Sequence, residues 1–197
     1  MALPATDDFN RTNANPAGGN WTTLKDLSAI QVSSNTVKGT SGESDAIWNA
    51  DSFGNDQYSQ ITLVTNDNDG WRWGVLVRGA GASATTAYVL RANTWSAEGC
   101  GLSSWVAGSL SLLQTVSQII GAGTVIRLEA QGTTLRIYDD GVQIGTDQTN
   151  SSIASGSAGI SMLNTTAAAD NWEGGNLAVS AISISISESL AFAEALD

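Results

Sequence analysis

The sequence predicts an all-β protein built as a two-sheet antiparallel β-sandwich, and three observations support this prediction. Short segments in which apolar and polar residues alternate recur along the chain, with turn residues between them. Almost no segment shows the periodicity of an amphipathic helix. Finally, alternating segments follow one another directly after Thr124, which is the pattern of a β-meander.

A long hairpin is expected in the first half of the chain. Tyr58–Thr65 and Trp71–Arg78 both alternate, and the polar segment Asn66–Gly70 between them supplies the turn. Upstream, the turn-rich loop Asn15–Asn20 precedes the first strands. The other strands predicted here are Trp21–Leu24, Ile30–Ser33, Ala46–Asn49 and Ala87–Asn93. The segment Trp105–Val116 is less regular, and we expect its leucines in the core, namely Leu110, Leu112 and Leu113.

The meander after Thr124 has one apolar and one polar face. Ile126, Leu128 and Ala130 fall on one side of its first strand, and the polar residues between them fall on the other. The turn Asp139–Gly141 predicts a tight hairpin, because Gly adopts the positive φ that such turns require. We therefore expect consecutive pairing of Val125–Ala130, Leu135–Ile137 and Val142–Ile144.

The last segment, residues 180–197, differs in composition from residues 1–179, which form the predicted domain. Ile182, Ile184 and Ile186 alternate with serines, and an Ala/Glu/Leu-rich stretch follows. One interpretation is an assembly tail, a strand that pairs with the edge of another subunit or of a larger particle. The other is an edge strand of the same sandwich followed by a frayed end. Since residues 1–179 already complete a sandwich, we expect the domain to fold without the tail.

Charge and composition exclude several functional classes. The net charge is −11 at pH 7 with only eight Lys and Arg, so neither nucleic acid nor an anionic membrane is an expected partner. The chain has no histidine and one cysteine, which excludes a Ser-His-Asp triad, a histidine-based zinc site and an intrachain disulfide. We expect that cysteine, Cys100, to be a buried and unreactive thiol. The first residues lack the basic and apolar regions of a signal peptide.

Motifs spread along the chain resemble those of a known family. They are Asp8–Arg11 with Asn20 and Trp21, Trp73–Arg78, Tyr88–Arg91, Ile126–Glu129 with Gly132, Tyr138–Gly141, Gly159–Ile160 and Asp170–Trp172. Together they resemble the concanavalin A-like lectin/glucanase jelly roll, in its laminin-G-like branch, over about residues 7–179. The resemblance implies a jelly-roll sandwich. Domains of this type occur in lectins, glycanases, adhesion modules and phage structural proteins, so the function has to be argued from the site.

The resemblance also indicates where a hydrolase would carry its catalytic groups. Glucanases of this fold place carboxylates on one strand as Glu-x-Asp-x-x-Glu or a near variant, because glycan hydrolysis needs a pair of them. This chain has no such arrangement: Glu129 is alone on its strand, and Glu43 and Asp45 lack a third partner. Asp139 and Asp140 are neighbours in a turn. From this absence we predict a protein without enzymatic activity, and a glycanase with an atypical site is the least favoured alternative.

Arginine and tyrosine residues on neighbouring strands are the candidates for ligand binding, because basic residues are scarce in this chain. The candidates are Arg72, Arg78, Tyr88 and Arg91. The alternative is that each arginine pairs with an acid and only solvates the sheet.

The sequence requires no cofactor, although calcium is a candidate because oxygen ligands gather at two places. Asp67 and Asp69 lie in the hairpin loop, which is otherwise an ordinary polar turn. Asp8 and Asp170 are expected to converge where the ends of the domain meet.

These features favour a virion structural or decoration module on a phage capsid or tail. The observations are the resemblance, the missing carboxylates, the tail and a surface with few charges, since only 14% of the residues are charged. The expected partners are other virion proteins or copies of itself, with cell-surface glycans as a further contact. The expected location is the virion surface. The alternative is a free carbohydrate-binding lectin domain.

Overall fold

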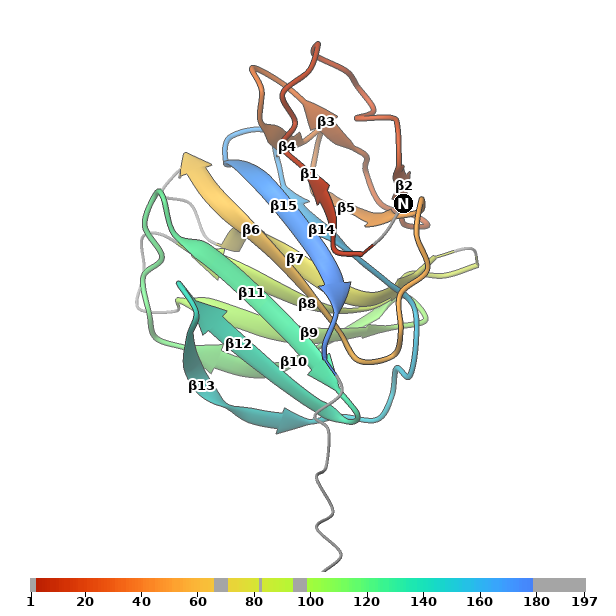
Figure 1. Ribbon diagram of the computed structural model, residues 1–197, viewed down its shortest axis with the longest axis vertical. Helices are drawn as coiled ribbons and strands as arrows, with labels where there is room; N and C mark the ends of the chain where they lie inside the picture. The colour runs from red at the N-terminus through yellow and green to blue at the C-terminus, as the bar shows by residue number, and fades with distance from the viewer. Residues whose placement is uncertain (1–2, 66–70, 82, 94–98, 179–197) are drawn as a thin grey trace, which may run out of the picture.

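The computed structural model describes residues 3–65, 71–81, 83–93 and 99–178, without the side chains of Trp71, Arg72 and Asn93. These residues form two antiparallel β-sheets that pack face to face, which confirms the predicted all-β sandwich (Figure 1). The described ranges include no helix long and apolar enough to cross a membrane.

Sheet A lies toward the viewer in Figure 1. Its strands in the described residues are β1 (Ala5–Asp7), β3 (Ile30–Val32), β4 (Val37–Gly39), β6 (Gln57–Thr65), β11 (Val125–Gln131), β12 (Thr134–Asp139), β13 (Val142–Thr149) and β15 (Ala168–Asn176). Their order is β13-β12-β11-β6-β15-β4-β3, and β1 pairs with β15.

Sheet B lies behind sheet A. Its strands in the same ranges are β2 (Trp21–Thr23), β5 (Glu43–Trp48), β7 (Trp71–Ala80), β8 (Thr86–Asn93), β9 (Cys100–Val106), β10 (Ser109–Val116) and β14 (Ser157–Leu163). Their order is β10-β9-β8-β7-β14-β5-β2. The first and last thirds of the chain therefore meet in both sheets.

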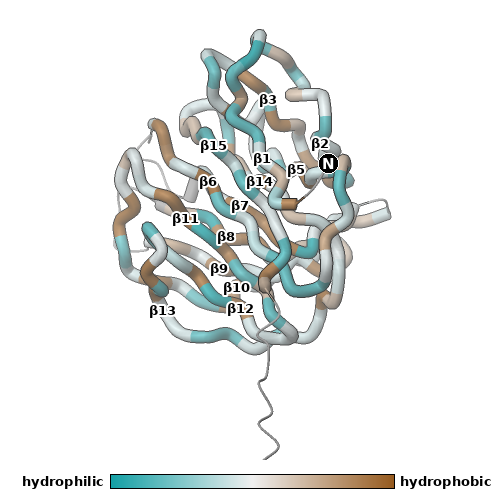
Figure 2. The backbone as a smooth tube through the Cα atoms, viewed as in Figure 1, coloured by the Kyte–Doolittle hydropathy of each residue, from teal (hydrophilic) through white to brown (hydrophobic). Residues whose placement is uncertain are grey.

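The predicted meander is confirmed as β11, β12 and β13. In the register, Leu128 lies opposite Ile137, and Ile137 lies opposite Ile144. Burial alternates along β11, so that Leu128 is fully buried while its polar neighbours face outward. Figure 2 shows the same alternation of hydrophilic and hydrophobic segments along the strands of sheet A. Gly141 closes the β12–β13 turn with a φ of 79°.

The expectation of buried leucines between residues 105 and 116 is wrong for two of them. This segment belongs to a hairpin of β9 and β10, and β10 is the edge strand of sheet B. Leu110 and Leu112 are 48% and 56% exposed because they project from the outer side of that edge. Leu113, shifted by a bulge between residues 112 and 114, packs partly against the core. The sequence analysis assigned no strand to β1, β4, β14 or β15.

An aromatic cluster fills one end of the core. Trp21 lies edge-on against Trp172 with ring centroids 4.7 Å apart, and against Trp48 at 5.2 Å. Phe9 stacks on Trp21 at 6.1 Å. Such edge-to-face pairs bury large apolar areas and are favoured over face-to-face stacks. The cluster ties strands β2, β5 and β15 to the start of the chain.

The carboxylate of Asp7 holds strand β1 in its place beside β15. Its Oδ2 accepts a hydrogen bond of 2.7 Å from the Trp21 indole, and its Oδ1 accepts one of 2.5 Å from Arg11. Asp7 also lies opposite Trp172 in the β1–β15 register. Strand β1 therefore continues sheet A beyond β15, on the side of β15 opposite β6.

Candidate functional site

The outer face of sheet A carries two adjoining hollows. A hollow of about 560 Å³ lies between β1, β15, β6 and β11, and its lining residues are Thr6, Asp7, Asp8, Gln60, Thr62, Val125, Asn171, Trp172 and Glu173. A hollow of about 260 Å³ continues toward β12, and its lining residues are Gln60, Val125, Arg127, Glu129, Tyr138 and Gly141. Since the hollows share Gln60 and Val125, we treat them as one depression, the sheet A groove.

Arg127 lines the smaller hollow of the sheet A groove. Its Nε donates a 2.7 Å hydrogen bond to Glu129 Oε1, and its Nη1 donates one of 3.2 Å to Gln60 Oε1. The guanidinium carbon lies 3.6 Å from the centroid of the Tyr58 ring. Strand geometry explains these contacts, because Arg127 and Glu129 are two residues apart and share a face. In the β11–β6 register, Arg127 lies opposite Gln60 and Glu129 lies opposite Tyr58.

Tyr58 connects Arg127 to the next strand. Its hydroxyl donates a 2.5 Å hydrogen bond to Glu173 Oε1 on β15. Gly175 lies opposite Tyr58, and a Cβ at Gly175 would come within 2.8 Å of the ring. Burial, together with the hydrogen bond to Glu173 and its charge, raises the pKa of Tyr58 to about 12. The hydroxyl therefore remains a donor at neutral pH.

Tyr138 extends the row to β12. It lies opposite Arg127 in the β11–β12 register, and its pKa is raised by burial and by the neighbouring Glu129. The side chains of Arg127 and Glu129 are 25% and 15% exposed, so a ligand in the groove reaches them without any unfolding. We call these five residues the polar row: Tyr138, Glu129, Arg127, Tyr58 and Glu173.

The end of the groove near β1 is acidic. Asp8 and Asn171 line it, and Asp170 is close enough for the charges of Asp8 and Asp7 to act on it. Burial raises the pKa of Asp170, and the two neighbouring carboxylates add to this effect, while a hydrogen bond from the Asn171 backbone opposes it. The structure thus brings Asp8 and Asp170 together, as expected from the sequence.

The polar row combines donors, acceptors and aromatic rings in fixed positions. The guanidinium and the tyrosine hydroxyl donate hydrogen bonds, whereas Glu129 and Glu173 accept them. Each carboxylate has further lone pairs for a ligand, because an ionised carboxylate offers about four acceptor sites. Such an arrangement suits a ligand that presents several hydroxyl groups, each of which both donates and accepts.

Arg78, a candidate from the sequence, lies inside the protein. It is 2% exposed, and its guanidinium donates hydrogen bonds to the carbonyl oxygens of Asn55, Ile153 and Gly132 at 2.7–2.9 Å. Its backbone φ is +53°, within a bulge between residues 77 and 80. In this position Arg78 ties three loops together.

Tyr88 and Arg91 are buried as well. The Tyr88 hydroxyl donates a 2.8 Å hydrogen bond to Asn150 Oδ1 and accepts one of 3.0 Å from the Ile153 N–H. Arg91 projects from the outer face of sheet B, where it donates to Ser161 Oγ at 2.7 Å and pairs with Glu43 at 2.9 Å and with Asp45 at 3.2 Å. Burial raises the pKa of Asp45, and the charge of Arg91 opposes this effect.

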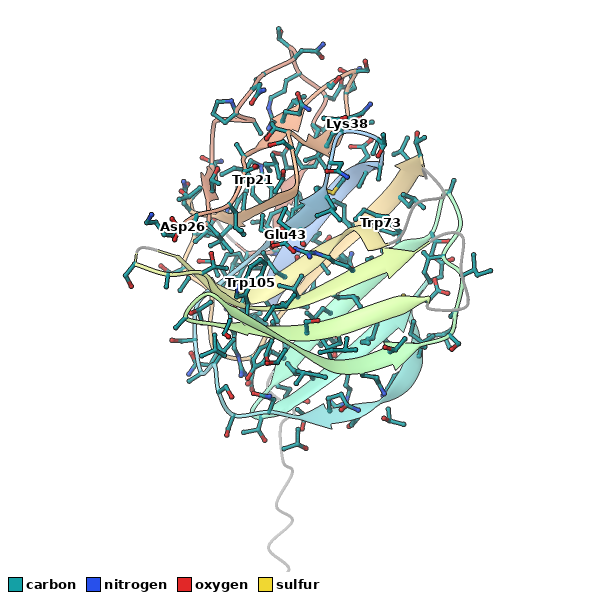
Figure 3. All side chains as sticks on the ribbon, turned by 180° about the vertical axis from the view of Figure 1, so that it is seen from behind. Trp21, Asp26, Lys38, Glu43, Trp73 and Trp105 are labelled. Atoms are coloured by element: carbon teal, nitrogen blue, oxygen red, sulfur yellow. The ribbon has the colours of Figure 1, made fainter. Side chains whose placement is uncertain are left out.

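Figure 3 views sheet B from its outer side and shows Glu43 and Trp105 near each other on that face. The Arg91 guanidinium lies 5.8 Å from the Trp105 ring centroid. The hydrogen bonds of Arg78, Tyr88 and Arg91 are thus used within the protein, and their role in ligand binding stays a prediction.

Several predicted positions fall outside the described residues: the side chain of Arg72, the calcium candidates Asp67 and Asp69, and the tail residues Ile182, Ile184 and Ile186. Within the described residues, no three His, Cys, Asp or Glu side chains gather in a way that could hold a metal ion. The calcium hypothesis therefore stays a prediction.

Sequence reasoning missed most of the polar row. Glu129 is the single carboxylate of its strand, but it is paired with Arg127 on the same face of that strand. Tyr58 and Glu173 are 115 residues apart, and only the pairing of β6 with β15 brings them together. A signal was available for Arg127 and Glu129, since outward-facing opposite charges two residues apart are recognisable in an alternating strand.

Comparison with solved structures places the fold among known sandwiches, whereas no protein-family model and no curated protein sequence matches the chain. The carbohydrate-binding module CBM66 from Bacillus subtilis aligns with a TM-score of 0.66 at 18% identity, over 80% of this chain and 96% of that module. The β-glucanase of Bacillus licheniformis aligns with a TM-score of 0.58 at 13% identity, over 90% of this chain and 100% of the enzyme.

The exoplasmic/lumenal domain of VIP36, in a form bound to Ca²⁺ and Man3GlcNAc, aligns with a TM-score of 0.56 at 14% identity, over 81% of this chain and 85% of that domain. The chain therefore has the jelly-roll fold of concanavalin A-like lectins and glucanases. At these identities the likeness shows the fold and leaves function to the site.

One prediction from the sequence needs correction. The absence of enzymatic activity was inferred from the missing Glu-x-Asp-x-x-Glu pattern. This inference is wrong, because the fold is shared with a β-glucanase along the whole length of that enzyme. A missing linear motif does not exclude carboxylates that come from different strands: Glu173 on β15 is hydrogen-bonded to Tyr58, and Glu129 on β11 is hydrogen-bonded to Arg127, which stacks on the same tyrosine. Turnover of glycans is therefore a question for measurement.

Proposed function

We propose that this chain is a carbohydrate-binding domain and that the sheet A groove is its binding site. The observation that carries the proposal is the polar row, in which Arg127 stacks on Tyr58 and is held by Glu129. Recognition of a sugar requires oriented donors and acceptors beside an apolar or aromatic surface. The row supplies both within one open depression of the sheet.

The polar row is ordered by the protein's own hydrogen bonds. Glu173 is fixed by Tyr58, and Glu129 is fixed by Arg127. A side chain that is already immobilised loses little further conformational entropy when a ligand binds, whereas a free side chain loses about 0.5–1.5 kcal/mol. Hydrogen bonds to charged groups contribute about 1.5–3 kcal/mol each, so a few of them suffice for measurable affinity.

The fold likeness supports the same function. Two of the solved structures with this fold are a carbohydrate-binding module and a lumenal domain bound to Man3GlcNAc. The open shape of the sheet A groove, which runs over neighbouring strands, is also suited to an oligosaccharide rather than to a deeply enclosed small molecule.

The narrower idea of a module on a phage particle rests on the sequence alone. We keep it as a proposal about where the domain works, with residues 180–197 as the segment that attaches it to virion proteins or to further copies of itself. Copurification of the intact chain with particles tests this placement separately from glycan binding. Glycan binding is measured both with and without a calcium chelator.

Affinity electrophoresis and calorimetric titration against soluble mannan, β-glucan, galactan and dextran test the proposed function. The wild type is expected to bind at least one of them. Arg127→Lys replaces the planar guanidinium with an ammonium group and should weaken glycan binding by about tenfold or more. Arg91→Lys is the matched control, since Arg91 pairs with Glu43 and Asp45 on the outer face of sheet B, on the other side of the sandwich from the groove. Reducing ends are counted in the same samples to detect turnover.

The proposed function is overturned if none of the polysaccharides binds, or if both arginine substitutions weaken binding equally. Melting curves of both variants show whether a loss of binding comes from unfolding.

A further inference from the structure

We propose that the sheet A groove selects uncharged glycans and rejects acidic ones, that is, glycans with uronate, sialic acid or sulfate groups. This inference rests on the proposed function and names the class of ligand for the same site. It follows from the balance of fixed charges along the groove, which is negative in the described residues.

Carboxylates outnumber cations along the groove. Its lining contains Asp7, Asp8 and Glu173 in the larger hollow and Glu129 in the smaller one. Arg127 is the basic residue among these lining residues. Arg11, next to β1, compensates Asp7, but Asp8 and Glu173 add two further negative charges to the larger hollow. The chain as a whole carries a net charge of −11 at pH 7.

Arg127 is not free to pair with an acidic ligand. Its Nη2 and Nε both lie 2.7 Å from Glu129 Oε1, and one side of its plane is covered by the Tyr58 ring. An anion that displaced Glu129 would leave a partly buried carboxylate without its partner. Loss of a partner for a buried charge costs more than an exposed ion pair contributes.

Two further arginines, Arg11 next to β1 and Arg136 on β12, are also engaged. Arg11 pairs with Asp7 at 2.5 Å, and Arg136 pairs with Asp147 at 3.0 Å. At the β1 end, the charges of Asp8 and Asp7 raise the pKa of Asp170, after the larger effect of burial. The potential at this end is therefore negative, as the charge count indicates.

Repulsion between like charges is effective at the distances of a bound ligand. Screening reduces it beyond the Debye length, which is about 8 Å at physiological ionic strength, and ligand atoms in the groove lie within that range. Neutral glycans avoid this repulsion while they still use the donors and acceptors of the polar row. Rejection through like charge is a common source of specificity.

The test compares each neutral polysaccharide of the panel with its own sulfated and carboxymethylated derivative. Calorimetric titrations are made in EDTA, so that divalent cations do not bridge two anions, and at low and physiological ionic strength. We expect the charged derivatives to bind at least about tenfold more weakly than their neutral parent. The difference should shrink as the ionic strength rises.

Charge-removing variants test the cause. The double substitution Asp8→Asn and Glu173→Gln preserves shape and should narrow the ratio between neutral and charged affinities. Asp26→Asn is the matched control and should leave the ratio unchanged, because exposed Asp26 pairs with Lys25 in the loop after β2, away from the groove (Figure 3).

The outcomes separate the two proposals. Binding of charged derivatives that equals or exceeds binding of the neutral parents overturns this inference and leaves carbohydrate binding in place. A ratio that responds equally to Asp26→Asn and to the groove substitutions also overturns it. Absence of binding to every probe, both in EDTA and with added calcium, overturns the proposed function and this inference with it.

Discussion

The guanidinium carbon of Arg127 lies 3.6 Å from the centroid of the Tyr58 ring, and this stack joins β11 to β6 at the smaller hollow of the sheet A groove. The two residues come from strands that pair directly, but their positions in the sequence are far apart. Tyr58 is also hydrogen-bonded to Glu173, so side-chain contacts connect the three neighbouring strands β11, β6 and β15. Arg127, Tyr58 and Glu173 are therefore held in place by contacts within the protein.

A spectroscopic titration of the tyrosines tests this environment. The chain has three tyrosines, and the pKa of Tyr58 is raised to about 12 by burial, by its hydrogen bond to Glu173 and by the charge of that residue. Tyrosinate absorbance should therefore contain a component that titrates near pH 12 and is missing in Tyr58→Phe. A wild type and variant that differ by a component titrating near the ordinary value of 10.0 would contradict this assignment.

The same shift has a consequence for stability. The folded pKa of Tyr58 lies above its unfolded value, so the neutral hydroxyl contributes stability that is complete below pH 10. This contribution decreases as the pH rises from about 10 to about 12, where the folded form also ionises. Tyr58→Phe lacks this contribution, so its free energy of unfolding should decrease less over the same pH range than that of the wild type.

Arg78 should be important for stability rather than for binding. Arg78→Lys retains the charge but cannot donate to the carbonyl groups of Asn55, Ile153 and Gly132 at once. We expect a loss of about 2–4 kcal/mol in the free energy of unfolding, measured by urea denaturation. Arg136→Lys, at a more exposed position, should change it by less than about 1 kcal/mol. Equal effects of both substitutions would show that the buried bonds of Arg78 contribute little.

Cys100 should be protected in the folded protein. Burial, with a smaller effect of Asp139, raises the pKa of its thiol from 9.0 to about 12, so little thiolate is present at neutral pH. We expect no measurable reaction with a disulfide reagent in the native state and stoichiometric reaction in denaturant. Rapid labelling of the native protein would show that this part of β9 opens readily.

The tail should be separable from the domain. Residues 3–178 already contain both sheets, so removal of residues 181–197 is expected to change the melting temperature by less than about 2 °C. Self-association or copurification with particles should be lost in the truncated chain. If the truncation instead unfolds the domain, the tail contributes an edge strand to the sandwich of the same chain.

The strands of the meander could be predicted from the sequence because their alternation has a physical cause. Leu128 and Ile137 must face the core, and this fixes the outward position of Arg127 without knowledge of the fold. The Asp140–Gly141 turn fixes the hairpin in the same way, since both residues adopt positive φ.

The rest of the site depends on contacts between distant segments. Tyr58 and Glu173 meet only through the order β11-β6-β15 in sheet A, which no local pattern encodes. Arg78 was expected on the sheet surface, but the bulge after Val77 and its φ of +53° turn it inward. Leu110 was expected in the core because it is apolar. It is exposed because it lies on β10, an edge strand whose outer side is open to solvent.

The most direct test of the central claim is the arginine side-chain region of a ¹H–¹⁵N correlation spectrum during titration with a bound glycan. The chain has six arginines, and Arg→Lys variants assign their Nε–Hε signals. The Arg127 side chain lies beside the Tyr58 ring, and its Nε–Hε signal should shift as the glycan is added. The signals of the buried Arg78 and Arg91 should stay in place. A shift of Arg91 or Arg78 with an unmoved Arg127 would contradict the proposed site and place glycan binding elsewhere than in the sheet A groove.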